Sequence, residues 1–104
     1  MQVQAFINDT ERFSAYGDVN GNNIAIYGEY RPSGWKFFYE MDNYKVNYYK
    51  FMEIFDEIMT RFIKKYQPSR IKLHTKFRIS PIILCNKNNY KYFVEKNKLI
   101  IEKV

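Results

Sequence analysis

Hydrophobic and polar residues alternate through much of the first forty positions, and this pattern predicts an antiparallel β-meander over about residues 13–41. Three runs carry an apolar residue at every second position. Asn20-Gly21 and Arg31-Pro32-Ser33-Gly34 separate the runs and have the residue types of tight turns. Residues 2–7 are compatible with one further short strand. One face of the meander is therefore expected to be apolar and to need a covering layer.

The period changes to that of a helix between residues 46 and 66. Apolar residues recur there at positions 48, 51, 52, 55, 58, 59, 62, 63 and 66, which is the spacing of one helical face. Asp42-Asn43 has the composition of an N-terminal cap, and Pro68 is expected to end the helix. Glu57 and Arg61 have the spacing of a favourable i,i+4 ion pair. A helix of this length spans about 30 Å and can cover the apolar face of the meander.

Strict alternation returns from Arg70 onward and predicts a strand over about residues 70–77. The odd positions are mostly apolar, whereas the even positions carry Arg70, Lys72, His74, Lys76 and Arg78. Because successive side chains of a strand point to opposite faces, one face is expected to be a row of basic residues and the other to be core. Whether this strand is central or at an edge stays open.

The remaining segments complete a single α+β domain over residues 1–104. Pro81 argues against a continuous strand, so Ile82 to Cys85 is either a short buried strand or a turn of helix. The pattern over about residues 90–104 predicts a C-terminal hairpin with its turn at Lys96-Asn97-Lys98. The predicted fold class is α+β, with one long helix on an antiparallel meander, followed by a strand and a hairpin.

The charge of the chain is unevenly distributed. The formal net charge is +6, but residues 1–60 hold five basic and nine acidic side chains, whereas residues 61–104 hold twelve basic and two acidic ones. This split favours an anionic partner for the second half. Lys, Asn, Ile, Tyr and Phe make up about half of the chain, a composition that AT-rich codons produce. The high lysine content can therefore also result from codon bias, if the chain comes from a low-GC bacterium, its phage or another mobile element.

Composition also excludes several classes of protein. A single cysteine allows no intramolecular disulfide and no cysteine-based zinc cluster. We find no secretory signal and no apolar run of membrane-spanning length, so the expected compartment is the cytoplasm. No Gly-rich phosphate loop and no metal-ligand spacing occurs, so we predict no cofactor.

The candidate binding residues are the basic side chains of the second half. They are Arg61, Lys64, Lys65, Arg70, Lys72, His74, Lys76, Arg78, Lys87 and Lys91. A row of such residues binds phosphates without sequence preference. The row of basic residues on the predicted strand is equally well explained as a solvated strand face, or as a set of lysines that protects a sheet edge from pairing with other chains.

Three further residue types are weighed against simpler explanations. Tyr90 and Tyr92 lie among lysines and could stack on unpaired bases, although strand aromatics more often pack on each other. His74, flanked by like charges, is expected to be mostly neutral and is more readily explained as an exposed polar residue. Cys85 is more readily explained as a small buried hydrophobic residue than as a nucleophile.

The pattern favours a small basic non-enzymatic binding protein. We expect it to engage nucleic acid, or a host complex that handles nucleic acid in defence or replication. Its composition suggests an accessory or inhibitor protein of a phage or mobile element. The alternative is a protein–protein interaction module or a charge-split homo-oligomer, with a homodimer as the simplest case.

A third hypothesis comes from a resemblance. The closing segments Tyr90-Lys91-Tyr92-Phe93-Val94-Glu95 and Leu99-Ile100-Ile101-Glu102-Lys103-Val104 resemble the end of RelE-like ribosome-dependent nucleases. The resemblance covers residues 90–104. It implies a small ribonuclease toxin that works with basic and tyrosine side chains. That family opens with helices, whereas this chain is predicted to open with a meander, so the ribonuclease ranks last.

Overall fold

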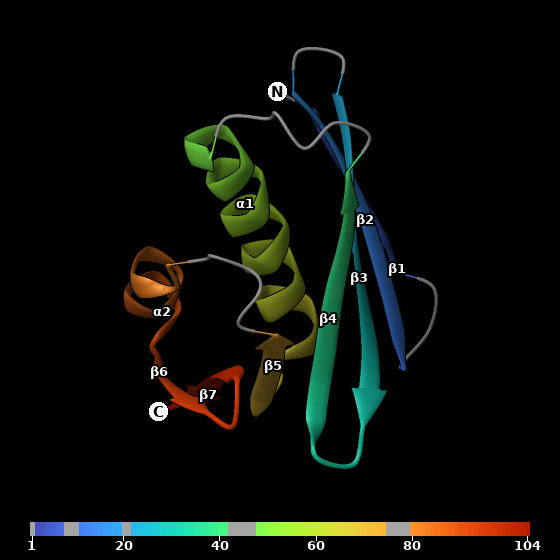
Figure 1. The fold of residues 1–104 in the computed structure, drawn as a ribbon. Helices are drawn as coiled ribbons and strands as arrows, with labels where there is room; N and C mark the ends of the chain where they lie inside the picture. The colour runs from blue at the N-terminus through green and yellow to red at the C-terminus, as the bar shows by residue number, and fades with distance from the viewer. Residues whose placement is uncertain (1, 8–10, 20–21, 42–47, 75–79) are drawn as a thin grey trace.

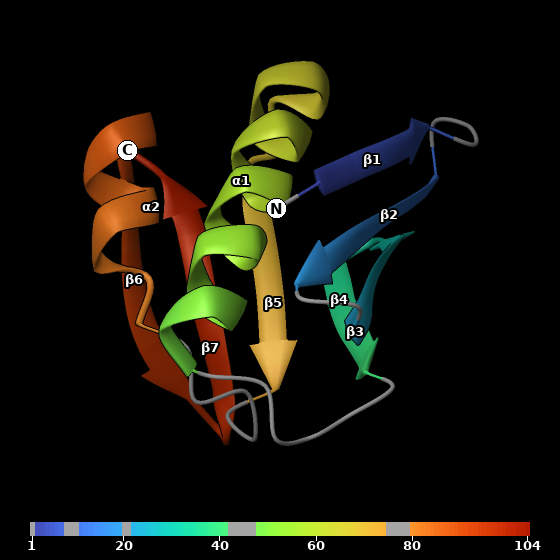
Figure 2. The same ribbon diagram turned by 90° about the horizontal axis from the view of Figure 1, so that it is seen from above.

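The computed structural model describes residues 2–7, 11–19, 22–41, 48–74 and 80–104. The chain forms a twisted sheet with both helices on one side of it (Figures 1 and 2). In chain order the elements are β1 (Gln2–Ile7), β2 (Arg12–Val19), β3 (Asn22–Arg31), β4 (Gly34–Met41), α1 (Tyr48–Tyr66), β5 (Arg70–His74), α2 (Ile82–Asn88), β6 (Tyr90–Glu95) and β7 (Lys98–Lys103). The predicted α+β class is confirmed.

The sheet has seven strands in the order β1-β2-β3-β4-β5-β7-β6. Neighbouring strands are antiparallel except for β4 and β5, which are parallel and are joined through α1. A parallel pair needs such a crossover, because a tight turn cannot return the chain to run in the same direction. Strand β5 therefore lies inside the sheet, between β4 and β7. This position removes edge protection as an explanation for its basic residues.

The predicted meander is present as β2, β3 and β4, and β1 pairs with β2 of the same chain. Pro32 and Ser33 form the turn between β3 and β4, and Gly34 follows with φ +125°. A Cβ at Gly34 would come within 3.0 Å of the Arg70 carbonyl oxygen, so glycine suits both its conformation and its close approach to β5. The predicted Asn20-Gly21 turn lies outside the described residues.

Helix α1 begins at Tyr48 and ends at Tyr66, close to the predicted range of 46–66. The apolar face predicted from the sequence is the buried face of the helix, and Phe55, Ile58 and Phe62 on it are fully buried. The chain leaves the helix at Gln67, which has φ +46°, and Pro68 follows. Arg61 Nε lies 3.0 Å from Glu57 Oε1, which confirms the predicted ion pair. The predicted Asp42-Asn43 cap lies outside the described residues.

The core between α1 and the sheet is rich in aromatic rings. The ring of Phe62 lies 4.8 Å from that of Phe37 and 4.9 Å from that of Trp35, both in edge-on geometry. Such pairs add to the stabilisation that comes from burying the rings. Ile71 and Leu73 of β5 belong to the same core and are almost fully buried. The predicted apolar face of β5 is thus confirmed for the described residues.

Residues 82–88 resolve the alternative that the sequence left open, because they form the helix α2. Leu84 and Cys85 are its buried residues and join the main core, as expected for Cys85. The predicted C-terminal hairpin is formed by β6 and β7. Lys96 and Asn97 make its turn with φ of 49° and 62°, as in a two-residue hairpin turn with positive φ at both positions. Residues 75–77 of the predicted strand lie outside the described part of the chain.

Candidate nucleic-acid interface

The sheet face opposite to the two helices, here called the open face, carries the candidate site. Side chains of the core lie at alternate positions of β2, β3, β4, β5 and β7, so the intervening positions project to the open face. Both helices contribute to one core on the other side. Within the described residues, neither α1 nor α2 lies over the open face.

Four basic residues meet on the open face at strands β4, β5 and β7. This cationic cluster consists of Lys36, Arg70, Lys72 and Lys98. Lys36 lies beside Lys72 in the parallel register of β4 and β5. The pKa of Lys72 is lowered, first by partial desolvation and then by the positive charges of Lys98, Arg70 and Lys36. Glu95 opposes this shift, and a bound anion would oppose it further, because an opposite charge favours the protonated lysine.

Carboxylates neutralise part of this surface, but not its centre. Arg70 forms ion pairs with Glu95 at 3.6 Å and with Glu102 at 3.3 Å. Lys91, on β6, lies 3.8 Å from the other oxygen of Glu102. Among the described residues, no ion pair includes Lys36, Lys72 or Lys98. Lys72 still feels the negative charge of Glu95, which raises its pKa against the other causes.

A shallow hollow of about 210 Å³ lies within this region. Its lining consists of Arg70, Lys72, Glu95, Lys96, Lys98 and Ile100. Four of these side chains are basic and one is acidic, so the hollow carries a net positive charge. Ile100 is 2 % exposed although it faces away from the helices, because the long side chains around it cover it. The surface of the hollow is therefore formed mainly by basic side chains.

Three aromatic residues run across the open face beside the cationic cluster. This aromatic strip consists of Tyr16 on β2, Tyr27 on β3 and Phe38 on β4. The ring centroids lie 6.4 Å apart for Tyr16 and Tyr27, and 6.0 Å apart for Tyr27 and Phe38. Tyr16 is 42 % exposed and Phe38 is 38 % exposed. The pKa of Tyr27 is raised, chiefly by a hydrogen bond with Tyr16.

The strip and the cluster adjoin each other. Phe38 is two positions beyond Lys36 on β4, and therefore about 6.6 Å further along the same face. From β2 to β7 the two features cross four strand spacings, or about 19 Å. Aromatic rings beside basic residues on an uncovered sheet are the groups that bind unpaired bases and their phosphates.

The sequence did not point to the aromatic strip. Its residues occupy the polar positions of the alternation, where single exposed aromatics are common. The available signal was Phe38, a large apolar residue between Lys36 and Glu40 on the side that faces away from the core. Only the pairing of β2, β3 and β4 shows that the three rings are neighbours.

The structure does not bring all predicted binding residues together. Arg61, Lys64 and Lys65 are on α1, and Lys87 is on α2. Both helices pack on the other side of the sheet, so these four residues do not share a face with Lys72. The sequence left open whether the helix end and the loop lysines share a face with the basic strand, and the structure places these four residues on the helix side of the sheet. Lys76 and Arg78 lie outside the described residues, as does the side chain of His74.

The two predicted stacking residues do not lie on the open face either. Tyr90 is 6 % exposed, and its hydroxyl donates a hydrogen bond of 2.5 Å to the carbonyl oxygen of Pro68. Its ring is therefore a core element and not available to a base. Tyr92 is 44 % exposed, but it lies opposite the core residue Ile101 and so projects to the helix side of the sheet. Lys91 lies opposite Glu102 and therefore projects to the open face.

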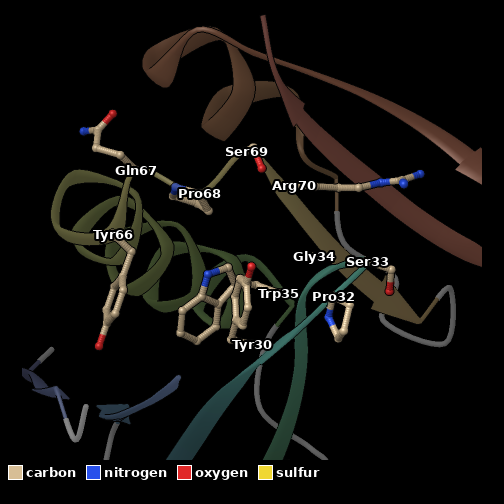
Figure 3. A pocket seen from close by; sticks show the side chains of 10 residues that line it. All are labelled: Tyr30, Pro32, Ser33, Gly34, Trp35, Tyr66, Gln67, Pro68, Ser69 and Arg70. Atoms are coloured by element: carbon tan, nitrogen blue, oxygen red, sulfur yellow. The ribbon is translucent and has the colours of Figure 1, made fainter. Parts of the chain in front are cut away.

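A second cleft of about 410 Å³ lies between the β3–β4 turn and the segment that joins α1 to β5. Tyr30 and Trp35 lie next to each other in it, with ring centroids 5.7 Å apart, and the Arg70 side chain extends away from them (Figure 3). Its lining includes no histidine and no carboxylate.

The two helices enclose one unusual carboxyl group. Asp56 Oδ1 is buried and has no hydrogen-bond partner among the described residues, and burial raises the pKa of Asp56 to about 6 although Lys87 opposes the shift. Burial, followed by the charge of Asp56, raises the pKa of the Cys85 thiol to about 11. Cys85 is thus protonated at neutral pH and is not an activated nucleophile.

Comparison with known proteins identifies no relative of this chain. No protein-family model matches the chain, and neither the curated proteins nor the solved structures gave a match. Within the described ranges, no group of three or more His, Cys, Asp or Glu side chains is arranged to hold a metal ion. None of the described helices is both long enough and apolar enough to cross a membrane.

Proposed function

We propose that this protein is a non-enzymatic nucleic-acid-binding protein whose open face binds a single strand. The observation that carries the proposal is the meeting of Lys36, Lys72 and Lys98 beside the aromatic strip on an uncovered sheet face. The lysines supply sequence-independent attraction to phosphates. Exposed Tyr16 and Phe38 supply ring surfaces for bases.

A single strand fits this face better than a duplex does. Bases in a duplex are stacked on each other, and their faces are not available to a protein ring. A single strand can lay its bases on the aromatic strip while its phosphates reach the cationic cluster. The surface is open rather than enclosed, which suits a chain that extends beyond it in both directions.

The first test compares binding to labelled single-stranded DNA, RNA and duplex DNA by fluorescence anisotropy at low salt. The Lys72→Glu/Lys98→Glu variant changes the net charge as much as its matched control, Lys64→Glu/Lys65→Glu on α1. We expect the open-face variant to lose at least ten-fold in affinity for single strands, with a much smaller loss in the control.

Equal losses in the two variants would mean that only net charge matters, and would contradict a site on the open face. Wild-type preference for duplex DNA would contradict the stacking part of the proposal. Failure of the wild type to bind any of the three ligands at low salt would refute the proposed function altogether.

A further inference from the structure

We propose that two copies of this chain pair through the outer edge of β6 and form a symmetric dimer with a continuous sheet. The proposal rests on the edge strand itself and does not depend on nucleic-acid binding. Strand β6 is the last in the sheet order, and Figure 2 shows it at the outer side of the sheet with α2 beside it. An uncovered strand edge is a template for pairing with another strand.

Strand β6 is unusually apolar for such an edge. Tyr92 is 44 % exposed, Phe93 is 37 % exposed and Val94 is 66 % exposed. The strand contains no proline, and its pairing with β7 runs without a bulge from Tyr90 to Glu95. Two of the devices by which isolated sheets avoid edge-to-edge contact, a proline and a β-bulge, are thus absent from β6, and its charged residues are Lys91 and Glu95.

The ladder between β6 and β7 decides which backbone groups face outward. The backbone N–H of Val104 donates to the carbonyl oxygen of Asn89, which makes these two residues a hydrogen-bonded pair. Hydrogen-bonded and non-bonded pairs alternate in an antiparallel ladder. The backbone N–H and C=O groups of Phe93 therefore form hydrogen bonds with β7, whereas those of Tyr92 and Val94 point away from β7. These outward groups are the ones that a second strand would use.

The sequence of β6 is self-complementary about Phe93. In an antiparallel pair with a two-fold axis at this residue, Phe93 lies opposite Phe93 of the second copy. Lys91 lies opposite Glu95 in both directions, and the outward groups of Tyr92 meet those of Val94. The aromatic and charged pairs fall at non-hydrogen-bonded positions, where side chains approach most closely. Each copy uses the same patch, as two-fold symmetry requires.

Charge selects this axis over its neighbours. An axis at Tyr92 would place Phe93 opposite Lys91 of the second copy, and an axis at Val94 would place it opposite Glu95. Only the axis at Phe93 pairs both charges with opposite charges. A foreign strand would have to reproduce this pattern of acid, aromatic and base, whereas the second copy supplies it. The open faces of both copies would lie on the same side of the joined sheet.

Sedimentation equilibrium measures the association directly. The wild type is expected to rise from the mass of one chain, 12.7 kDa, toward twice that mass with increasing protein concentration. Lys91→Glu should raise the dimer dissociation constant on the order of ten-fold, because the new carboxylate would lie opposite Glu95 of the second copy at two places across the axis. The double variant Lys91→Glu/Glu95→Lys should restore it, because it re-forms both pairs with reversed polarity.

The charge swap separates the dimer from effects within one chain. Lys91 also pairs with Glu102, and Glu95 also pairs with Arg70, in the same chain. The double variant disrupts both of these contacts, so a recovery of dimerisation cannot come from them. Circular dichroism of each variant confirms that the monomer is folded. If the double variant is folded but does not regain dimerisation, the proposed register with its axis at Phe93 is refuted.

Crosslinking tests the axis independently of charge. Phe93→Cys places two thiols opposite each other at a spacing within the range that a disulfide bridges. Lys91→Cys places the same group on the same face, but about 13 Å from its copy. The native Cys85 is buried and does not compete. We expect mild oxidation to give a covalent dimer with Phe93→Cys and not with Lys91→Cys. A wild type that stays monomeric, or equal crosslinking of both variants, would overturn the proposal.

Discussion

The buried carboxyl group of Asp56 makes the stability of the fold depend on pH in a direction that can be measured. Its pKa rises from 3.8 to about 6, and burial is the main cause. The folded state therefore binds more protons than the unfolded chain between these two values. Consequently the free energy of unfolding falls as the pH rises through this window, and the loss is complete above it.

The size of this effect follows from the shift. Two pKa units correspond to about 3 kcal/mol at 1.36 kcal/mol per unit. Because Asp56 is only partly buried and Lys87 lies near it, solvent screening reduces this figure to about 1–3 kcal/mol. Asp56→Asn keeps the shape of the side chain and removes its charge. We expect it to raise the free energy of unfolding by that amount at about pH 7.5, and to change it little at about pH 4.

Urea denaturation at both pH values, with the wild type and the variant in parallel, measures the difference. Other carboxylates contribute equally to both proteins and cancel. Glu53→Gln, an exposed site on the same helix, is the matched control and should show no such pH-dependent gain. The reasoning is refuted if Asp56→Asn stabilises the protein equally at both pH values, or destabilises it at about pH 7.5.

Three other predictions concern the packing of the core and the open face. Gly28→Ala should lower the free energy of unfolding by about 1–3 kcal/mol, because the new Cβ would lie 2.6 Å from Phe37 Cε1; a thermal melt without a lower midpoint would contradict this. Tyr90→Phe should cost about 1–3 kcal/mol in urea denaturation, since it leaves the buried Pro68 carbonyl oxygen without its donor, and unchanged stability would argue against that bond. Phe38→Ala should weaken single-strand binding by about 1–3 kcal/mol with little effect on a duplex; equal losses in an anisotropy titration would count against stacking.

Much of the fold could be predicted because its signals are local. The alternation in residues 13–41 and the helical spacing before Tyr66 each report a periodicity that burial enforces, and both elements are present. The run Ile82 to Cys85 was too short to distinguish a strand from a helix. Its assignment depends on packing against α1 and β6, which no local pattern encodes.

The candidate site was harder to predict because it depends on long-range pairing. The alternation at Arg70 and Lys72 correctly indicated two faces. No local pattern indicates that β5 lies inside the sheet beside Lys36, which is distant in the chain. The helix lysines Lys64 and Lys65 were grouped with the strand because charge was counted along the chain. The structure places them on the exposed side of α1, beyond the core that lies between α1 and the sheet.

The measurement that tests the central claim most directly is the salt dependence of single-strand binding. Three phosphate contacts, from Lys36, Lys72 and Lys98, predict that the logarithm of the association constant falls with that of the salt concentration with a slope of about −2. The affinity should then drop about 20-fold between about 50 and 200 mM salt.

Lys72→Ala/Lys98→Ala should reduce the slope to about −0.7, and Lys64→Ala/Lys65→Ala should leave it near −2. A wild-type slope near zero, or equal slopes in the two variants, would contradict binding by the open face.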